Sequence, residues 1–223
     1  MNVAIIQFPG TNCDLDTQYA FEKAGAKTQL VWHKEVALSK TTDLVVLPGG
    51  FSYGDYLRSG AIAKFSPIMA AVINFADRGG QVLGICNGFQ ILLESHLLPG
   101  AMKKNENVHF ISRYHRLKVE SNENPFLQNL QKGDILNVPI AHGEGNYYID
   151  ETGLQELHDH DQILLTYCDA HGEVNNPNGS VASIAGICNR KRNVFGLMPH
   201  PERAIEPLLG SDDGMKMIQG LLR

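Results

Sequence analysis

The sequence predicts an α/β fold, a three-layer sandwich in which helices cover both faces of a central, mostly parallel sheet. Short apolar runs bounded by Gly and Pro alternate with segments whose apolar residues repeat at helical spacing. Such alternation, with short connections, implies right-handed crossovers between parallel strands. The composition, 43% hydrophobic and 19% charged, is that of a globular protein, and we expect a single domain over residues 1–223.

The first half of the chain has the clearest alternation. A helix over residues 14–23 carries apolar Leu15, Tyr19 and Phe21, and Gly25 stands where a helix-ending glycine is expected. The next helix has strong start signals in Ser66-Pro67 and stops before a glycine pair at 79–80. A third helix, about 87–94, follows its strand directly. The strands expected in this half cover residues 3–8, 29–32, 44–47 and 81–85.

The second half is richer in strands and ends in a helix over about 212–222. Segments dense in Asn, Ser, Gly and Pro, at 105–107, 121–125 and 175–179, are expected to be loops. The strands expected here cover residues 110–120, 134–140, 163–167, 183–188 and 194–197.

Charge and apolar content exclude several classes of protein. The net charge is −5, and the longest basic run, residues 190–192, sits between asparagines and is typical of a solvated turn, so no nucleic-acid partner is expected. No stretch approaches the roughly 20 apolar residues of a membrane span, and the start lacks the pattern of a signal peptide. Four scattered cysteines without a C-x-x-C pair suggest neither a disulfide framework nor a zinc knuckle. We therefore expect a cytoplasmic protein.

Residues 82–90 are the most informative stretch. An apolar strand runs into Gly84-Ile85-Cys86-Asn87-Gly88 and emerges as a helix, which is the pattern of a nucleophile elbow with cysteine in place of serine. The tight turn requires small residues on both sides of the nucleophile, and a helix N-terminus favours the thiolate of Cys86. The remaining cysteines we interpret as buried structural residues, namely Cys13, Cys168 and Cys188.

A thiolate nucleophile needs a base, and the base needs a group that orients it. His200-Pro201-Glu202 offers both on one short segment. Proline disfavours the helical region for the residue before it, so we expect extended backbone from His200. In extended backbone residues two apart face the same way, which lets Glu202 hold one imidazole nitrogen while the other faces Cys86.

The strand over 44–47 ends in Pro48-Gly49-Gly50, a third element of the site. A glycine pair at the carboxyl edge of a parallel sheet frees a backbone N–H to point into the cleft, where such folds bind ligands. Together with the N–H of Asn87, this freed N–H is a candidate for a two-donor oxyanion hole. Alone, a Pro-Gly-Gly cluster is a weak signal, since most are turns.

Taken together, these motifs resemble the class I (triad) glutamine amidotransferases, whose flavodoxin-like fold fits the prediction above. The resemblance spans nearly the whole chain and is strongest to the family of glutaminase subunits of phosphoribosylformylglycinamidine synthase, an enzyme of purine biosynthesis. The motifs that carry it lie at residues 8–14, 49–58, 84–90, 139–145, 176–180 and 198–204.

The resemblance implies a mechanism in which Cys86 attacks the side-chain amide of glutamine. The N–H groups of Gly50 and Asn87 would stabilise the oxyanion, and His200, held by Glu202, would transfer the protons. Ammonia then leaves, and water hydrolyses the glutamyl thioester.

By the same similarity Gln90 and the backbone at His142-Gly143 would hold the amino-acid end of glutamine; for His142 itself a structural role is equally open. No metal or organic cofactor is expected on this chain, which has no G-x-x-x-x-G-K-[ST] phosphate loop. Because amidine formation requires ATP, the resemblance implies a separate synthetase subunit that uses ATP and Mg²⁺ and receives the ammonia. The presence of a small third subunit is left open.

Two other functions use the same scaffold. A cysteine peptidase or hydrolase would share the elbow, but Gln90 and the late His-Pro-Glu favour an amidotransferase; ammonia release without action on peptides would distinguish them. A non-catalytic regulatory subunit would keep the fold without the chemistry, and the intact triad argues against it. Labelling of Cys86 by a glutamine-analogue diazoketone would decide between these.

Overall fold

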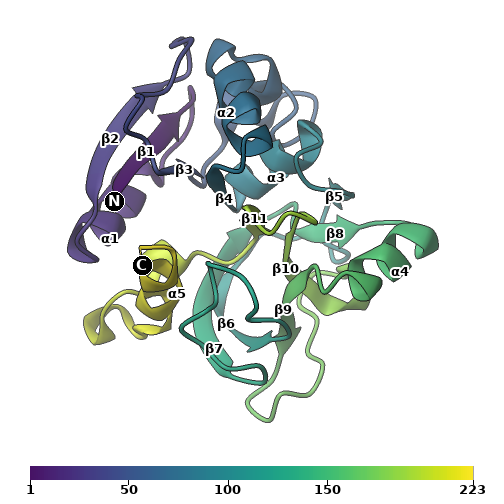
Figure 1. The fold of residues 1–223 in the computed structure, drawn as a ribbon. Coiled ribbons are helices and arrows are strands. Elements are labelled where there is room, and N and C mark those ends of the chain that lie inside the picture. The colour runs from purple at the N-terminus through teal and green to yellow at the C-terminus, as the bar shows by residue number, and fades with distance from the viewer. Residues whose placement is uncertain (223) are drawn as a thin grey trace.

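The protein is described by a computed structural model over residues 1–222 (Figure 1). Within those residues the main sheet has nine strands, and a second sheet has two, β5 (Ala101–Lys103) and β8 (Asn146–Tyr148). The main strands are β1 (Asn2–Gln7), β2 (Lys27–Trp32), β3 (Leu44–Leu47), β4 (Gln81–Ile85), β6 (Ile111–Val119), β7 (Ile135–His142), β9 (Ile163–Cys168), β10 (Ile184–Cys188) and β11 (Val194–Leu197). The helices are α1 (Asp14–Lys23), α2 (Pro67–Asp77), α3 (Asn87–Glu94), α4 (Glu151–Asp159) and α5 (Asp213–Leu221).

The strand order in the main sheet is β2-β1-β3-β4-β11-β10-β9-β6-β7. From β2 to β11 every neighbouring pair is parallel, whereas from β11 to β7 every pair is antiparallel. The parallel half uses the alternating first part of the sequence, and β11 returns late in the chain to pair with β4, with Leu197 opposite Ile85. The α/β fold class expected from the sequence is confirmed.

Helices cover the parallel half on both faces (Figure 1). Helices α1 and α5 lie together on one side, and α2 and α3 lie on the other side against β4. Because both faces are covered, the central strands are apolar throughout rather than alternating, and all four residues of β3 are fully buried. The carboxyl ends of β3, β4 and β11 therefore meet in a rigid part of the sheet.

Several local expectations hold, and one is wrong. Gly25 has φ +95° just after α1, and Ser66-Pro67 begin α2, although the Ser66 hydroxyl bonds to Tyr53 rather than capping the helix. In α1, however, Leu15 and Tyr19 are 63% and 52% exposed. The helix packs instead through smaller residues and one ring, Thr17, Ala20 and Phe21.

Helix α4 and the two short strands of the second sheet were not expected. Helix α4 begins after Asp150, whose side chain accepts a hydrogen bond from the Gly153 N–H at 2.7 Å, and it buries only Leu157. With a single buried side chain the helix has almost no apolar period to detect. Over the described residues 1–222, no helix has the length and apolar character needed to cross a membrane.

Candidate active site

The turn after β4 forms the expected elbow. Cys86 has φ +50° and ψ −106°, a conformation that non-glycine residues rarely adopt and that is found where surrounding packing enforces it. A Cβ on Gly88 would lie 1.8 Å from the carbonyl oxygen of Leu47, and a Cβ on Gly84 would lie 2.7 Å from the Gly88 carbonyl carbon. Only glycines fit on either side of this cysteine, because α3 packs directly onto β3 and β4.

Cys86 is 6% exposed and immediately precedes the first turn of α3. Its Sγ lies 3.7 Å from the carbonyl oxygen of Ala141 on β7. The first N–H groups of a helix have no partner within the helix, so the thiol stands where backbone donors and the helix dipole favour negative charge. The site is thus suited to a thiolate.

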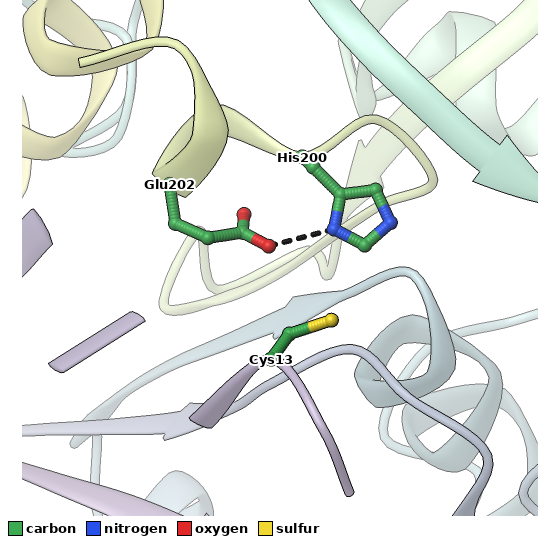
Figure 2. Close-up of side chains that lie close together, drawn as sticks. All are labelled: Cys13, His200 and Glu202. Carbon is green, nitrogen blue, oxygen red and sulfur yellow. Dashed lines mark hydrogen bonds and ion pairs between the residues drawn. The ribbon is translucent and has the colours of Figure 1, made fainter. Parts of the chain in front are cut away.

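The His200–Glu202 pair forms, but not by the expected route. His200 Nδ1 and Glu202 Oε1 are 2.6 Å apart, and both side chains are buried (Figure 2). The backbone of His200 is non-helical (φ −107°, ψ 85°), as the following proline requires. Beyond it the chain is not extended: residues Pro201–Arg203 form a 3-10 turn, in which the Arg203 N–H bonds to the His200 carbonyl at 3.1 Å. The tight turn, rather than strand alternation, brings Glu202 to the imidazole.

The charge balance around His200 favours its protonated form. Burial opposes protonation, but the Glu202 carboxylate and the nearby Cys86 outweigh it and raise the His200 pKa well above its ordinary value. The backbone N–H of His200 bonds to the Pro139 carbonyl of β7 at 2.8 Å, which fixes the residue against the sheet. These contacts therefore support an imidazolium at His200.

The Gly49-Gly50 loop lies next to the imidazole. A Cβ on Gly49 would come within 2.8 Å of His200 Cε1, and a Cβ on Gly50, which has φ +142°, would come within 2.7 Å of the Asn12 backbone nitrogen. The Asn87 side chain accepts a hydrogen bond from the Ser52 N–H at 3.0 Å, which ties this loop to the elbow. Within residues 1–222 the Gly50 N–H donates no hydrogen bond, so it is free to serve a ligand.

The expected substrate-binding residues line the same edge of the sheet. Gln90 donates to the Glu144 carbonyl at 2.6 Å and accepts from the Asn87 amide at 3.0 Å, so it links α3 to the loop after β7. Asn105, in the segment between β5 and β6, bonds through its Oδ1 to His142 Nδ1 at 3.1 Å, and its backbone N–H bonds to the Gly143 carbonyl at 2.9 Å. Burial, followed by the charge of His200, lowers the pKa of His142 to about 4, which keeps its ring neutral.

Two residues of this region were not singled out from the sequence. Asn105 organises the loop after β7 although it lies in a segment that reads only as a loop. Cys13, interpreted as structural, is buried as expected, but its Sγ faces the His200 ring and accepts a hydrogen bond from Arg203 Nη2 at 3.2 Å (Figure 2). In the sequence, Cys13 is distinguished only by its place in the motif at residues 8–14, and no rule of local structure indicates from that motif that it lies beside His200.

Comparisons with known proteins agree with this geometry. Residues 1–215 match the model of the CobB/CobQ-like glutamine amidotransferase domain. The chain is 66% identical over 223 residues, the full length of both chains, to the phosphoribosylformylglycinamidine synthase subunit PurQ of Sulfurimonas denitrificans. It is 62% identical to that of Wolinella succinogenes, over 99% of both chains.

The chain belongs to the PurQ family of glutamine amidotransferases. The structural comparison agrees: a chain in the structure of PurLQS from Thermotoga maritima superposes with a TM-score of 0.89 and 42% identity, over 99% of this chain and 97% of that one. Family membership confirms the resemblance drawn from the sequence and makes the chain an enzyme subunit.

Proposed function

We propose that this chain hydrolyses glutamine to glutamate and ammonia, with Cys86 as nucleophile, His200 as acid and base, and Glu202 as the group that orients His200. The observation that carries the assignment is the 2.6 Å His200–Glu202 hydrogen bond after β11. Cys86 stands on a strained elbow after β4, the strand that pairs with β11. Family membership supplies the reaction, and the geometry supplies the roles.

The chemistry follows from the charges. The Cys86 thiolate attacks the side-chain carbonyl carbon of glutamine, and the negative charge moves to the carbonyl oxygen. The His200 imidazolium gives its proton to the departing nitrogen, so that ammonia leaves and a glutamyl thioester remains. His200, now neutral, takes a proton from water, which attacks the thioester and releases glutamate.

Two backbone donors suit the developing oxyanion. The Gly50 N–H has no hydrogen-bond partner within residues 1–222, and the Asn87 N–H opens helix α3. Removal of one such donor typically slows hydrolysis about 10²–10³-fold. We assign the glutamine amino-acid end to Gln90 and to the backbone at His142-Gly143, whose positions Asn105 fixes.

The ammonia serves a second subunit. The relatives are named as subunits of phosphoribosylformylglycinamidine synthase, and the matched solved structure is of PurLQS. By this relationship residues 1–223 act as one amidotransferase domain that delivers ammonia to a synthetase subunit, which converts formylglycinamide ribonucleotide to the amidine with ATP. A third, small subunit belongs to that proposal, as does a cytoplasmic location. Thiolate and oxyanion hole supply this half of the catalysis, so we propose no cofactor on the chain itself.

The division of labour is tested by Cys86→Ala in the complex reconstituted with the synthetase. We expect glutamine-dependent amidine synthesis to be abolished and ammonia-dependent synthesis to stay nearly intact. Cys188→Ala, which removes a buried thiol on β10, is the matched control and should keep both activities. Equal loss of both activities in a Cys86→Ala complex that still assembles would overturn the assignment.

A further inference from the structure

A second thiol completes a three-donor cluster at the triad. Cys13, which precedes α1, His200 and Glu202 each offer one donor atom, and these three atoms lie within 4.8 Å of one another (Figure 2). Each of the three residues is 3% exposed or less. The cluster thus joins a sulfur, an imidazole nitrogen and a carboxylate oxygen in one buried space, although Cys13 has no part in the hydrolysis described above.

This donor set matches one class of ligand. Thiolate, imidazole and carboxylate together are the ligands of Zn²⁺ and chemically similar thiophilic cations, whereas Mg²⁺ and Ca²⁺ favour oxygen alone. The second carboxylate oxygen of Glu202, Oε2, is buried and makes no hydrogen bond within residues 1–222. A buried carboxylate oxygen without a partner is unfavourable, and coordination of a cation by both oxygens of Glu202 would satisfy it.

The geometric adjustment is small. With bonds of about 2.0–2.3 Å in a tetrahedral site, nitrogen and oxygen donors lie roughly 3.4 Å apart, and sulfur and nitrogen roughly 3.6 Å apart. The His200–Glu202 contact of 2.6 Å would open by about 0.8 Å, and the sulfur, which lies within 4.8 Å of the other donors, would approach the nitrogen by at most about 1.2 Å.

Arg203 already binds the Cys13 thiol and would compete with a cation for it, but Arg203 also has a second partner. Arg203 Nη2 donates to Cys13 Sγ at 3.2 Å, and the same guanidinium bonds through Nε to Asp16 at 3.1 Å. When the sulfur turns to a cation, Arg203 keeps its partner in α1. The neighbouring positive charge weakens cation binding, and the cation must compete with it.

We propose that Cys13, His200 and Glu202 form an inhibitory site for a thiophilic divalent cation of the zinc type. An ion there removes the Glu202 carboxylate from His200 and holds the imidazole in a coordination bond. Binding of the ion and turnover of glutamine are then mutually exclusive, a consequence that rests on the proposed function of His200. The ion-binding itself does not rest on that function.

Co²⁺, a spectroscopic substitute for Zn²⁺, tests the site in the full-length Cys86→Ala chain, where the nucleophile no longer contributes a thiolate. We expect a thiolate-to-cobalt charge-transfer band in Cys86→Ala and in the control Cys86→Ala/Cys188→Ala. In Cys86→Ala/Cys13→Ala the band should disappear, with at least about tenfold weaker binding. If Cys86→Ala/Cys13→Ala unfolds at a lower temperature than Cys86→Ala, the variant Cys86→Ala/Cys13→Ser takes its place. A serine hydroxyl is close to the thiol in size but is a poor ligand for the cation.

The outcomes separate this site from the glutaminase assignment. A band that persists after removal of Cys13, or no band in Cys86→Ala, overturns the site and leaves the proposed hydrolysis untouched. In the reconstituted wild-type complex, Zn²⁺ should block glutamine-dependent synthesis before ammonia-dependent synthesis. The half-inhibiting Zn²⁺ concentration should rise at least about tenfold in Cys13→Ser.

Discussion

Asp55 in the loop after the glycine pair is held in an unfavourable ionised state. It is half-buried and faces the Glu144 carboxylate; burial first, and repulsion by Glu144 second, raise its pKa from 3.8 to about 6. A carboxyl whose folded pKa lies above its unfolded value destabilises the fold once it ionises. The penalty is absent below about pH 4, grows between pH 4 and 6, and is complete above pH 6. Asp55→Asn should therefore stabilise the protein at pH 8 and not at pH 4.

The size of the gain follows from the shift. About two pKa units correspond to about 3 kcal/mol as an upper bound. Because the side chain is only partly buried, screening reduces this, and we expect Asp55→Asn to add about 1 kcal/mol to the free energy of unfolding at pH 8.

Urea unfolding at pH 8 and near pH 4, followed by circular dichroism, measures the difference. Asp159→Asn, an exposed position at the end of α4, is the matched control and should change stability by less than about 0.5 kcal/mol at either pH. If Asp55→Asn gains as much near pH 4 as at pH 8, or nothing at pH 8, the account of Asp55 is wrong.

Three further predictions concern the elbow, the triad and the glycine-pair loop. Gly88→Ala places a Cβ 1.8 Å from a backbone oxygen of β3 and should cost about 3 kcal/mol or more in urea unfolding, whereas Gly133→Ala, with φ +93° but open space, should cost about 1–2 kcal/mol; equal costs would contradict the packing argument. In the assembled complex Glu202→Gln keeps a hydrogen bond to His200 and should lose clearly less glutaminase activity than His200→Ala, unless Glu202 does more than orient. The isolated chain should be a slow glutaminase that the synthetase accelerates, because the backbone of a glycine-pair loop is easily misaligned; equal rates alone and in complex would refute this.

The parts of the fold that the sequence predicts well are those governed by local rules. A strand that ends in Gly-x-Cys-x-Gly permits one turn, and the structure shows it at Cys86 with φ +50°. The Gly25 and Ser66-Pro67 signals likewise mark helix ends because each acts on its own backbone. The short α4 is not predicted by its sequence, because capping by Asp150, rather than an apolar stripe, marks it.

Residues that act through distant contacts could not be found this way. Cys13 meets Arg203 across 190 residues of sequence, and Asn105 meets His142 across 37. Neither contact produces a repeating pattern of residue types in the sequence. The direction of the later strands was equally hidden, because pairing of β9 with β6 and β10 depends on which edge is free after β11 has joined β4.

The position of β11 beside β4 sets when this protein becomes an enzyme. Cys86 follows the one strand and His200 follows the other, yet the two strands are made in different halves of the chain. During synthesis on a ribosome the elbow emerges long before its base, and domains of this size complete folding only when their late elements are available. On the roles proposed above, a nascent chain, or one clipped before His200, therefore carries the nucleophile without its base. Such a chain would not consume glutamine until the last strand has joined the sheet.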